Sequence, residues 1–239
     1  ALRLIFAAAD LLNVRALAVI SPEFSELTVQ DLTNLLGPVL DASADYVKPV
    51  LPRAPEDGPL VTQLVRPLLS TVFGARMLEP IDPLLACSRG FARRALQSQG
   101  WDAPFAQYGL DPWLGALAAL EGFRLAQSRL HTQHASLRGQ AELSEVFRQV
   151  VGSVFSVISA ESARWRAVTE VREVPTLGQA IAPAPSRLCF DVDACVRASR
   201  EGVEALQPVL KDVLRAQTLA SLQAAGHSAR IDDALWVRI

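Results

Sequence analysis

The sequence predicts a mainly α-helical fold, an irregular multi-helix bundle or helical array with a small β element near the C-terminus. Two observations predict it. Apolar residues recur at helical spacing along most of the chain, and prolines, glycines and capping residues divide that pattern into about seven to nine helices. Half of the 239 residues are hydrophobic and 20% are charged, so the chain has enough core-forming side chains to fold without disulfides or metals.

The N-terminal quarter is expected to hold two helices. Residues 2–20 combine alanines and larger apolar side chains with few charges, which indicates a helix that is buried on most of its surface. Thr28 and Asp31 have the spacing of a helix N-cap and its acidic third position, and this helix should stop at Gly37. A proline-rich loop is expected over residues 48–59.

The middle of the chain is expected to consist of helices joined by loops, one of them over residues 101–110. Residues 60–99 form two helices in this interpretation, with Asp82 capping the second, and Asp111 caps the next. The spacing then predicts a long helix over residues 112–138 and another over 141–168. A turn between them would make an antiparallel hairpin.

The chain is divided into a helical body, residues 1–174, and a C-terminal segment, residues 175–239, packed on the same domain. Within the segment, residues 193–225 read as helix with an interruption near Pro208. Two runs alternate in the manner of short strands, namely Leu188, Phe190 and Val192, and Leu235, Val237 and Ile239.

Charge and cysteine content limit the classes of function. The net charge of −2 gives no general reason to bind nucleic acid, so we expect none. Three cysteines do not make a disulfide framework, which favours an intracellular, reducing compartment. No apolar stretch reaches the length of a membrane span. Of the 23 basic residues only Lys48 and Lys211 are lysine, a bias that indicates a GC-rich gene.

Aromatic residues gather between two predicted helices. Trp101, Tyr108 and Trp113 lie within thirteen positions, in and beside a loop that contains proline. Exposed aromatic side chains are typical of interface hot spots, so these three are candidates for an interaction surface. The alternative is that they form the lid of the core.

Arg89, Arg93 and Arg94 make a small basic cluster on one predicted helix, and we add them to the candidate interaction surface. Such a cluster can contact phosphates. More often it is a solvated helix face or pairs with carboxylates.

His131 and His134 form a His-x-x-His pair that a helix would place on one face, so they are candidate metal ligands. Glu142 or His227 could supply a third ligand. The simpler interpretation is two surface histidines near a helix end.

The sequence contains no phosphate-binding glycine loop, nucleophile elbow, zinc-protease motif or dinucleotide fingerprint. We therefore expect a protein–protein interaction or scaffolding domain, without enzymatic activity or cofactor, cut from a larger intracellular protein such as a viral structural or assembly protein. Its partners would be another protein or neighbouring domains of the parent. The alternative is a helical small-molecule- or metal-binding domain with enzymatic activity. Its pocket would be lined by Trp113, His131, His134 and Phe155.

Overall fold

The computed structural model describes residues 1–22, 24, 27–52, 58–82, 84–103, 110–132, 140–179, 182, 191–228 and 231–239. The chain divides into two compact units, Ala1–Ser186 and Arg187–Ile239. The first unit contains a five-stranded mixed β-sheet with helices on both faces, so the expectation of a mainly helical bundle is wrong.

The sheet of the first unit has the strand order β1-β4-β2-β5-β7. Its strands are β1 (Ala16–Val19), β4 (Leu85–Ser88), β2 (Tyr46–Val50), β5 (Leu125–Arg129) and β7 (Thr176–Leu177). β2, β5 and β7 are parallel to one another, whereas β4 is antiparallel to both β1 and β2. Four strands therefore share one direction, and β4 alone is reversed. A separate two-stranded sheet pairs β3 (Ala75–Arg76) with β6 (Arg172–Glu173).

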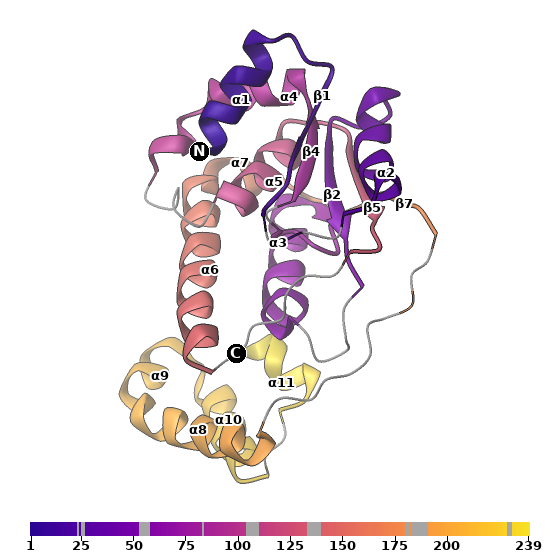
Figure 1. Ribbon diagram of the computed structural model, residues 1–239. Coiled ribbons are helices and arrows are strands. Elements are labelled where there is room, and N and C mark those ends of the chain that lie inside the picture. Colours follow the sequence, from indigo (N-terminus) through magenta and orange to yellow (C-terminus); the bar gives the residue numbers. More distant parts are fainter. Residues whose placement is uncertain are drawn as a thin grey trace. The chain divides into compact units, whose positions relative to one another are not determined.

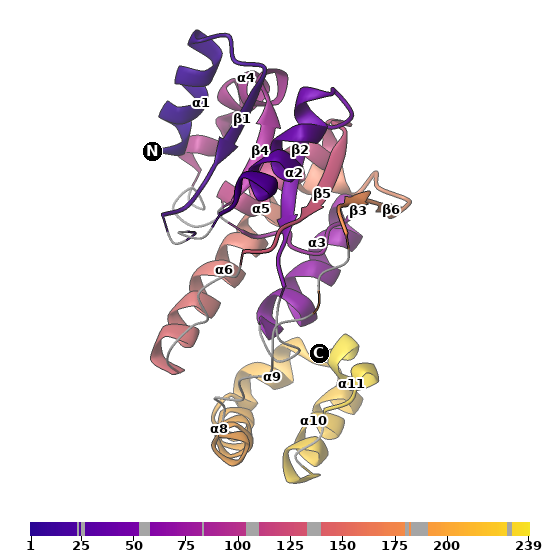
Figure 2. The ribbon, with the colours of Figure 1, turned by 45° about the vertical axis from the view of Figure 1, so that its right-hand side comes forward.

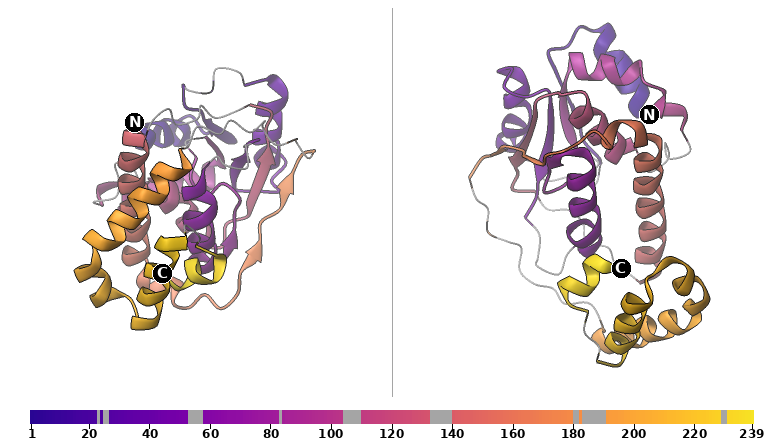
Figure 3. Two further views of the ribbon diagram at one scale, coloured as in Figure 1. Left: turned by 90° about the horizontal axis from the view of Figure 1, so that it is seen from below. Right: turned by 180° about the vertical axis from the view of Figure 1, so that it is seen from behind.

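Helices cover the two faces of the sheet unequally. On one face α2 crosses β1, β4, β2 and β5, while α1, α4 and α5 lie on the other (Figures 1 and 2). The helical elements of this unit are α1 (Leu2–Leu11), α2 (Val29–Leu40), the π-helical turn η1 (Leu60–Val65), α3 (Arg66–Phe73), α4 (Arg89–Leu96), the 3-10 turn η2 (Gln99–Asp102), α5 (Leu110–Leu120), α6 (Gln140–Ala160) and α7 (Ser162–Trp165). From behind, α6 is seen running beside α3 (Figure 3).

The two faces have different cores. The α2 face is aliphatic, with Leu35, Val47 and Leu84 at its centre. The opposite face is aromatic: Phe6 of α1 meets Trp101 edge-on at 5.7 Å, and Phe91 of α4 lies 4.8 Å from Tyr46 of β2. Such edge-to-face and tilted pairs add to the stabilisation from apolar burial.

The predicted first helix, residues 2–20, ends early. α1 stops at Leu11, Asn13 adopts a left-handed φ of 54°, and residues 16–19 form β1. Asn is one of the few residues that tolerate this conformation. Periodicity could not separate the two elements, because a short apolar strand resembles a turn of buried helix.

The predicted proline-rich loop and the predicted helix over residues 112–138 each contain a strand instead. β2 includes Pro49 and pairs in parallel with β5, so that Lys48 lies opposite Gln127. α5 ends at Leu120, and Gly122 turns the chain with a φ of 73°. The expected antiparallel hairpin is therefore wrong, since a strand separates α5 from α6.

Other local predictions are confirmed. Thr28 and Asp31 form a complete capping box at the start of α2, although the helix continues through Pro38 to Leu40. α6 and α7 together occupy most of the predicted helix over residues 141–168.

The second unit is helical in the part that the structure describes. It contains α8 (Val192–Ala205), α9 (Gln207–Val213), α10 (Ala216–Ser228) and α11 (Asp233–Arg238). The strand expected over residues 235–239 is wrong, because Asp232 caps α11 there through the Leu235 amide. Leu188 and Phe190 lie outside the described residues, and Val192 begins α8.

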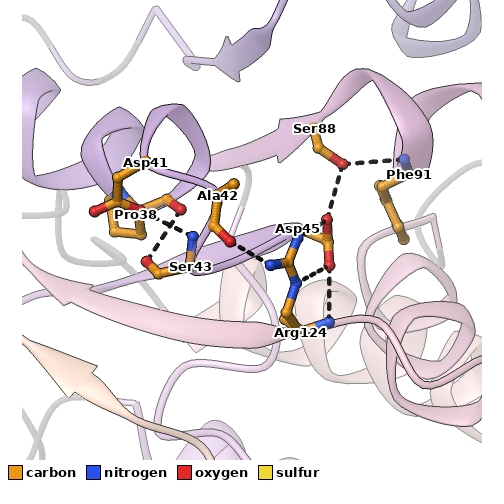
Figure 4. A network of polar contacts seen from close by, with 8 residues as sticks. All are labelled: Pro38, Asp41, Ala42, Ser43, Asp45, Ser88, Phe91 and Arg124. Atoms are coloured by element: carbon orange, nitrogen blue, oxygen red, sulfur yellow. Dashed lines mark hydrogen bonds and ion pairs between the residues drawn. The ribbon is translucent and has the colours of Figure 1, made fainter.

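A polar network ties β2 to β5 where the two strands begin (Figure 4). The Arg124 guanidinium donates to both carboxylate oxygens of Asp45, at 2.8 and 2.9 Å, and its backbone N–H donates to the same carboxylate at 3.1 Å. The Ser88 hydroxyl adds a longer contact of 3.4 Å from β4. One carboxylate thus connects three neighbouring strands.

Within the described ranges, none of the helices combines the length and the apolar character needed to cross a bilayer.

Candidate functional site

The candidate site lies at the edge of the sheet where β1, β2 and β5 end and the reversed strand β4 begins. In open α/β sheets this carboxyl edge is where ligands bind, because the loops that leave it are free to carry polar side chains. Two groups of polar residues lie here. One is centred on Lys48 and the other on Asp31.

Lys48 is the centre of a buried ion pair. Its side chain projects from β2 toward the aromatic face of the sheet and is fully buried there. Its ammonium Nζ lies 2.9 Å from Oδ1 of Asp111, in the first turn of α5, and donates a second hydrogen bond to the backbone carbonyl of Asp82. The other Asp111 oxygen accepts from the Asp82 backbone N–H. Lys48, Asp111 and Asp82 form what we call the Lys48 cluster.

The loop before β4 is held by polar side chains at both of its ends. Gln127 of β5 accepts from the Leu78 N–H, and Arg66 of α3 donates to the Leu78 carbonyl at 2.7 Å. The Lys48 cluster fixes Asp82 at the other end. Between these anchors the Glu79 carboxylate is 3% exposed and lies 3.9 Å from Arg66. These contacts hold the loop at both ends and place the buried carboxylates of Glu79 and Asp82 at the carboxyl edge.

Burial perturbs the ionisation of this cluster. Burial raises the pKa of Asp111, and the neighbouring Lys48 ammonium opposes but does not cancel that effect. Burial also raises the pKa of the Tyr46 phenol well above its usual value, with the Asp111 carboxylate acting in the same direction. The Tyr46 hydroxyl has no hydrogen-bond partner among the residues that the structure describes. Perturbed groups of this kind gather at functional sites.

The second group joins Asp31 of α2 to His131, which follows β5. The Asp31 carboxylate is fully buried and accepts from the Thr28 hydroxyl at 2.7 Å, the Thr28 N–H at 3.1 Å and the His131 N–H at 2.8 Å. The imidazole Nδ1 of His131 lies 3.3 Å from Oδ1 of the same carboxylate. Burial raises the pKa of Asp31, but these hydrogen bonds outweigh that effect and leave it below the ordinary value. Asp31 is therefore an ionised acceptor.

His131 is the predicted metal-site residue that the structure describes, and it lies in a loop rather than on a helix. Its imidazole is 60% exposed. His134 lies outside the described residues, as do the side chains of Glu142 and His227. Within the described ranges, His, Cys, Asp and Glu side chains nowhere gather in a group of three suited to a metal ion.

The predicted aromatic surface residues pack inward. Trp113 is 2% exposed and Trp101 is 9% exposed, and their rings meet edge-on at 5.2 Å. The Trp101 indole N–H donates to the Ala95 carbonyl at 2.7 Å. Tyr108 lies outside the described residues. Both tryptophans thus belong to the core on the aromatic face of the sheet, and Phe155 of α6 is half exposed.

The predicted arginine cluster is engaged with carboxylates. Arg89 and Arg93 both contact Asp10 at the end of α1, with their Nε atoms 2.7 and 3.2 Å from Oδ1. Arg94 pairs with Glu121, just beyond α5. These contacts join α4 to the helices on either side of it.

Lys48 was missed as a site residue, and Asp82 and Asp111 were predicted only as helix caps. One signal in the sequence pointed to Lys48. It is one of two lysines in a chain that otherwise uses arginine, and it interrupts an apolar run from Tyr46 to Leu51. The pairing with Asp111 could not be predicted, because the two residues are 63 positions apart and meet only through the sheet.

No protein-family model matches the sequence, and no curated protein matches it. Among solved structures, glucosyl-3-phosphoglycerate synthase from Mycobacterium tuberculosis in complex with phosphoglyceric acid is similar to this chain, with 22% identity, a TM-score of 0.47, and 61% of this chain and 50% of that one covered. The same enzyme with Mg²⁺ and uridine diphosphate gives 25% identity, a TM-score of 0.46 and the same coverage. Mannosyl-3-phosphoglycerate synthase from Rubrobacter xylanophilus gives 20% identity and a TM-score of 0.43, covering 70% of this chain and 52% of that one.

These similar structures are glycosyltransferases, and the chain matches about half the length of each. Together with the mixed sheet, they contradict the expected scaffolding or protein–protein interaction domain without enzymatic activity. At these identities and TM-scores the likeness assigns no role to any residue.

Proposed function

We propose that the first unit is a glycosyltransferase domain that binds a sugar-containing substrate at the carboxyl edge of its sheet. The observation that carries the proposal is the Lys48 cluster, an ammonium and carboxylates held by mutual hydrogen bonds on an otherwise aromatic face. The chemistry of this cluster gives two supports for the function, and the similar structures give a third.

The first support is energetic. Burying a lysine and its partner carboxylate costs several kcal/mol per ion before their attraction is counted, and apolar residues of similar size often give equal or greater stability. Folding alone therefore does not explain why Lys48 and Asp111 occupy the centre of the sheet edge. A role in binding explains it.

The second support is the match between these groups and a sugar. Carboxylate oxygens accept hydrogen bonds from the hydroxyl groups that a sugar carries. The Lys48 ammonium is itself fully buried, and its part is to hold the Asp111 carboxylate in place. Asp111 is about one fifth exposed, so its outer face remains open to a ligand while Lys48 and the Asp82 N–H hold its two oxygens in place. Such fixed polar groups determine how a polar ligand is oriented.

The third support is the substrate class named for the similar structures. The Mycobacterium tuberculosis enzyme was solved with UDP-glucose, phosphoglyceric acid and Mn²⁺. A nucleoside diphosphate sugar as donor and a small phosphorylated hydroxy acid as acceptor are therefore the first substrates to test.

The experiment measures UDP-glucose and phosphoglyceric acid binding by calorimetry, and glucosyl transfer by mass spectrometry, with Mg²⁺ or Mn²⁺ added. We expect the wild-type chain to bind both and to form a glucosyl product. Asp111→Asn should weaken binding by at least about tenfold, since it removes a charged hydrogen-bond acceptor. Asp102→Asn, a change at an exposed carboxylate, should leave binding unchanged.

A second variant separates binding from folding, because Asp111→Asn leaves Lys48 buried without its counter-ion. The double variant Lys48→Met with Asp111→Leu replaces the ion pair by apolar side chains and should fold at least as stably as Asp111→Asn. It should bind neither ligand. Wild-type affinity in a folded double variant, or no binding by the wild-type chain to any nucleoside diphosphate sugar, would contradict the proposed function.

A further inference from the structure

We propose that His131 is a catalytic residue of this edge, whose Nε2 accepts the proton of the acceptor hydroxyl while the Asp31 carboxylate holds its Nδ1. The inference rests on the proposed function, because it assigns a partner to His131 in that reaction. It is carried by the contacts of Asp31, independently of the Lys48 cluster.

The hydrogen bonds of Asp31 determine which nitrogen of His131 carries the proton. Both Thr28 groups donate to Oδ2, whereas the His131 N–H donates to Oδ1. A carboxylate that receives only donors is an ionised acceptor, so the imidazole nitrogen facing it must carry hydrogen to interact favourably. Neutral His131 is thereby held with its hydrogen on Nδ1. Its Nε2 is then an unprotonated acceptor.

The residues that hold His131 belong to regular secondary structure. Asp31 is the third residue of α2 and completes the capping box with Thr28, so the carboxylate that orients the imidazole is fixed by a helix. The Leu130 N–H donates to the Val50 carbonyl at 3.1 Å, which attaches the other side of His131 to the end of β2. A buried carboxylate behind a histidine is the arrangement that orients a general base and stabilises the imidazolium it becomes.

The position of His131 suits the reaction. Lys48 lies opposite Gln127 in the β2–β5 pair, and His131 is four residues beyond Gln127. At about 3.3 Å per residue, it lies about 13 Å beyond Lys48 along the strand direction. Asp31 lies on the α2 face of the sheet and the Lys48 cluster on the opposite face, so the two groups can share a ligand only across the carboxyl edge. The imidazole is 60% exposed, which leaves Nε2 open to an acceptor at that edge.

The acceptor oxygen forms a bond to the anomeric carbon of the sugar as the bond from that carbon to the donor diphosphate breaks, and the bonding pair leaves with the diphosphate. The hydroxyl proton moves to Nε2, and the resulting imidazolium pairs with Asp31. The proton is then released to water, which restores the neutral histidine.

The first test is a nitrogen spectrum of the full chain labelled with ¹⁵N-histidine, with the His131 signals assigned by their loss in His131→Gln. In the neutral imidazole of the wild-type chain we expect the hydrogen to be on Nδ1 and Nε2 to be unprotonated. Asp31→Asn should give a mixture of tautomers, because an amide can donate or accept. Adding phosphoglyceric acid should shift Nε2 of His131 and leave the His227 signals in place.

The second test is kinetic. His131→Gln should lower kcat for glucosyl transfer by about 10²- to 10⁴-fold with KM for phosphoglyceric acid little changed, as expected for loss of a general base. Asp31→Asn should lower kcat less and alter the pH profile, since Asp31 positions His131 without touching the substrate. The Asp102→Asn variant, at an exposed carboxylate, is the control and should keep wild-type kcat.

The outcomes separate the two proposals. Wild-type kcat in His131→Gln, or an Nε2–H tautomer in the wild-type chain, would overturn the role of His131 and leave the Lys48 site standing. If the chain neither binds UDP-glucose and phosphoglyceric acid nor transfers glucose, both proposals fail, even when His131 has the expected tautomer. Loss of kcat in His131→Gln together with an unchanged affinity would support the general base.

Discussion

Asp45 shows at the scale of one residue how this sheet depends on charge. The hydrogen bond from the Arg124 guanidinium is the largest of the effects that set the pKa of Asp45 below its ordinary value, and it outweighs burial. A carboxyl whose pKa is lower in the folded state stabilises the protein above its unfolded pKa of about 4, and this stabilisation is lost as the pH falls further.

We therefore predict that Asp45→Asn lowers the melting temperature at pH 7 by about 2–4 °C, corresponding to roughly 1 kcal/mol of lost charged hydrogen bonding. Between pH 5 and pH 3 the difference between variant and wild type should shrink, because the wild-type carboxyl becomes protonated. Thermal melts of both proteins across this pH range measure the difference in melting temperature. Asp102→Asn is the control, and an equal pH-dependent difference in that variant would refute the role of Asp45.

The carboxylates of the candidate site were visible in the sequence only through their local roles. Thr28 and Asp31 were recognised as a capping box, but the same carboxylate also holds His131, 100 positions later in the chain. Asp111 was predicted as a helix cap, but it lies in the first turn of α5, which begins at Leu110. The cap predicted at Asp82 is wrong, because Ser88 caps α4. Local patterns report what a residue does for its own helix, whereas the second partner of each carboxylate comes from the sheet topology.

At the scale of elements, the helices were largely predictable and the strands were not. α6 has a long amphipathic pattern and α2 has a complete cap, so both signals are local. β1 is four apolar residues, β2 contains lysine and proline, and β5 ends in three polar side chains. In none of these strands do apolar and polar residues alternate clearly. Helices cover both faces of the sheet, so neither face has to be polar.

The packing of α5 against η2 gives a prediction at this scale. A Cβ added at Gly100 would lie 2.1 Å from the buried ring of Trp113, so Gly100→Ala must displace the ring or the backbone. We expect a loss of about 1–3 kcal/mol in the free energy of unfolding, the usual cost of overpacking a core. Urea denaturation measures this loss.

Gly152 provides the matched control for Gly100. It lies inside α6, and a Cβ there would meet no atom within 4 Å. Gly152→Ala should therefore stabilise the protein by roughly 0.5–1 kcal/mol through the helical preference of alanine. Equal effects of the two substitutions would show that the contact with Trp113 is not what restricts position 100.

At the scale of the whole molecule, the candidate site belongs to one unit. Lys48, Asp111, Asp31 and His131 all lie within Ala1–Ser186. We predict that a chain of residues 1–186 unfolds cooperatively and keeps the UDP-glucose affinity of the full chain within about threefold, since no residue of the site is removed. Calorimetry on both chains makes the comparison, and loss of binding by a folded fragment would show that the second unit contributes to the site.

The order of strands in the sheet also bears on how the protein is made. β7, which pairs with the outer edge of β5, is formed by residues 176 and 177, after the whole of α6. A ribosome adds about 5–20 residues per second, so for several seconds the nascent chain presents β5 with unpaired backbone groups. During synthesis this open edge is the point where a chaperone would protect the chain and where a neighbouring nascent chain could pair wrongly.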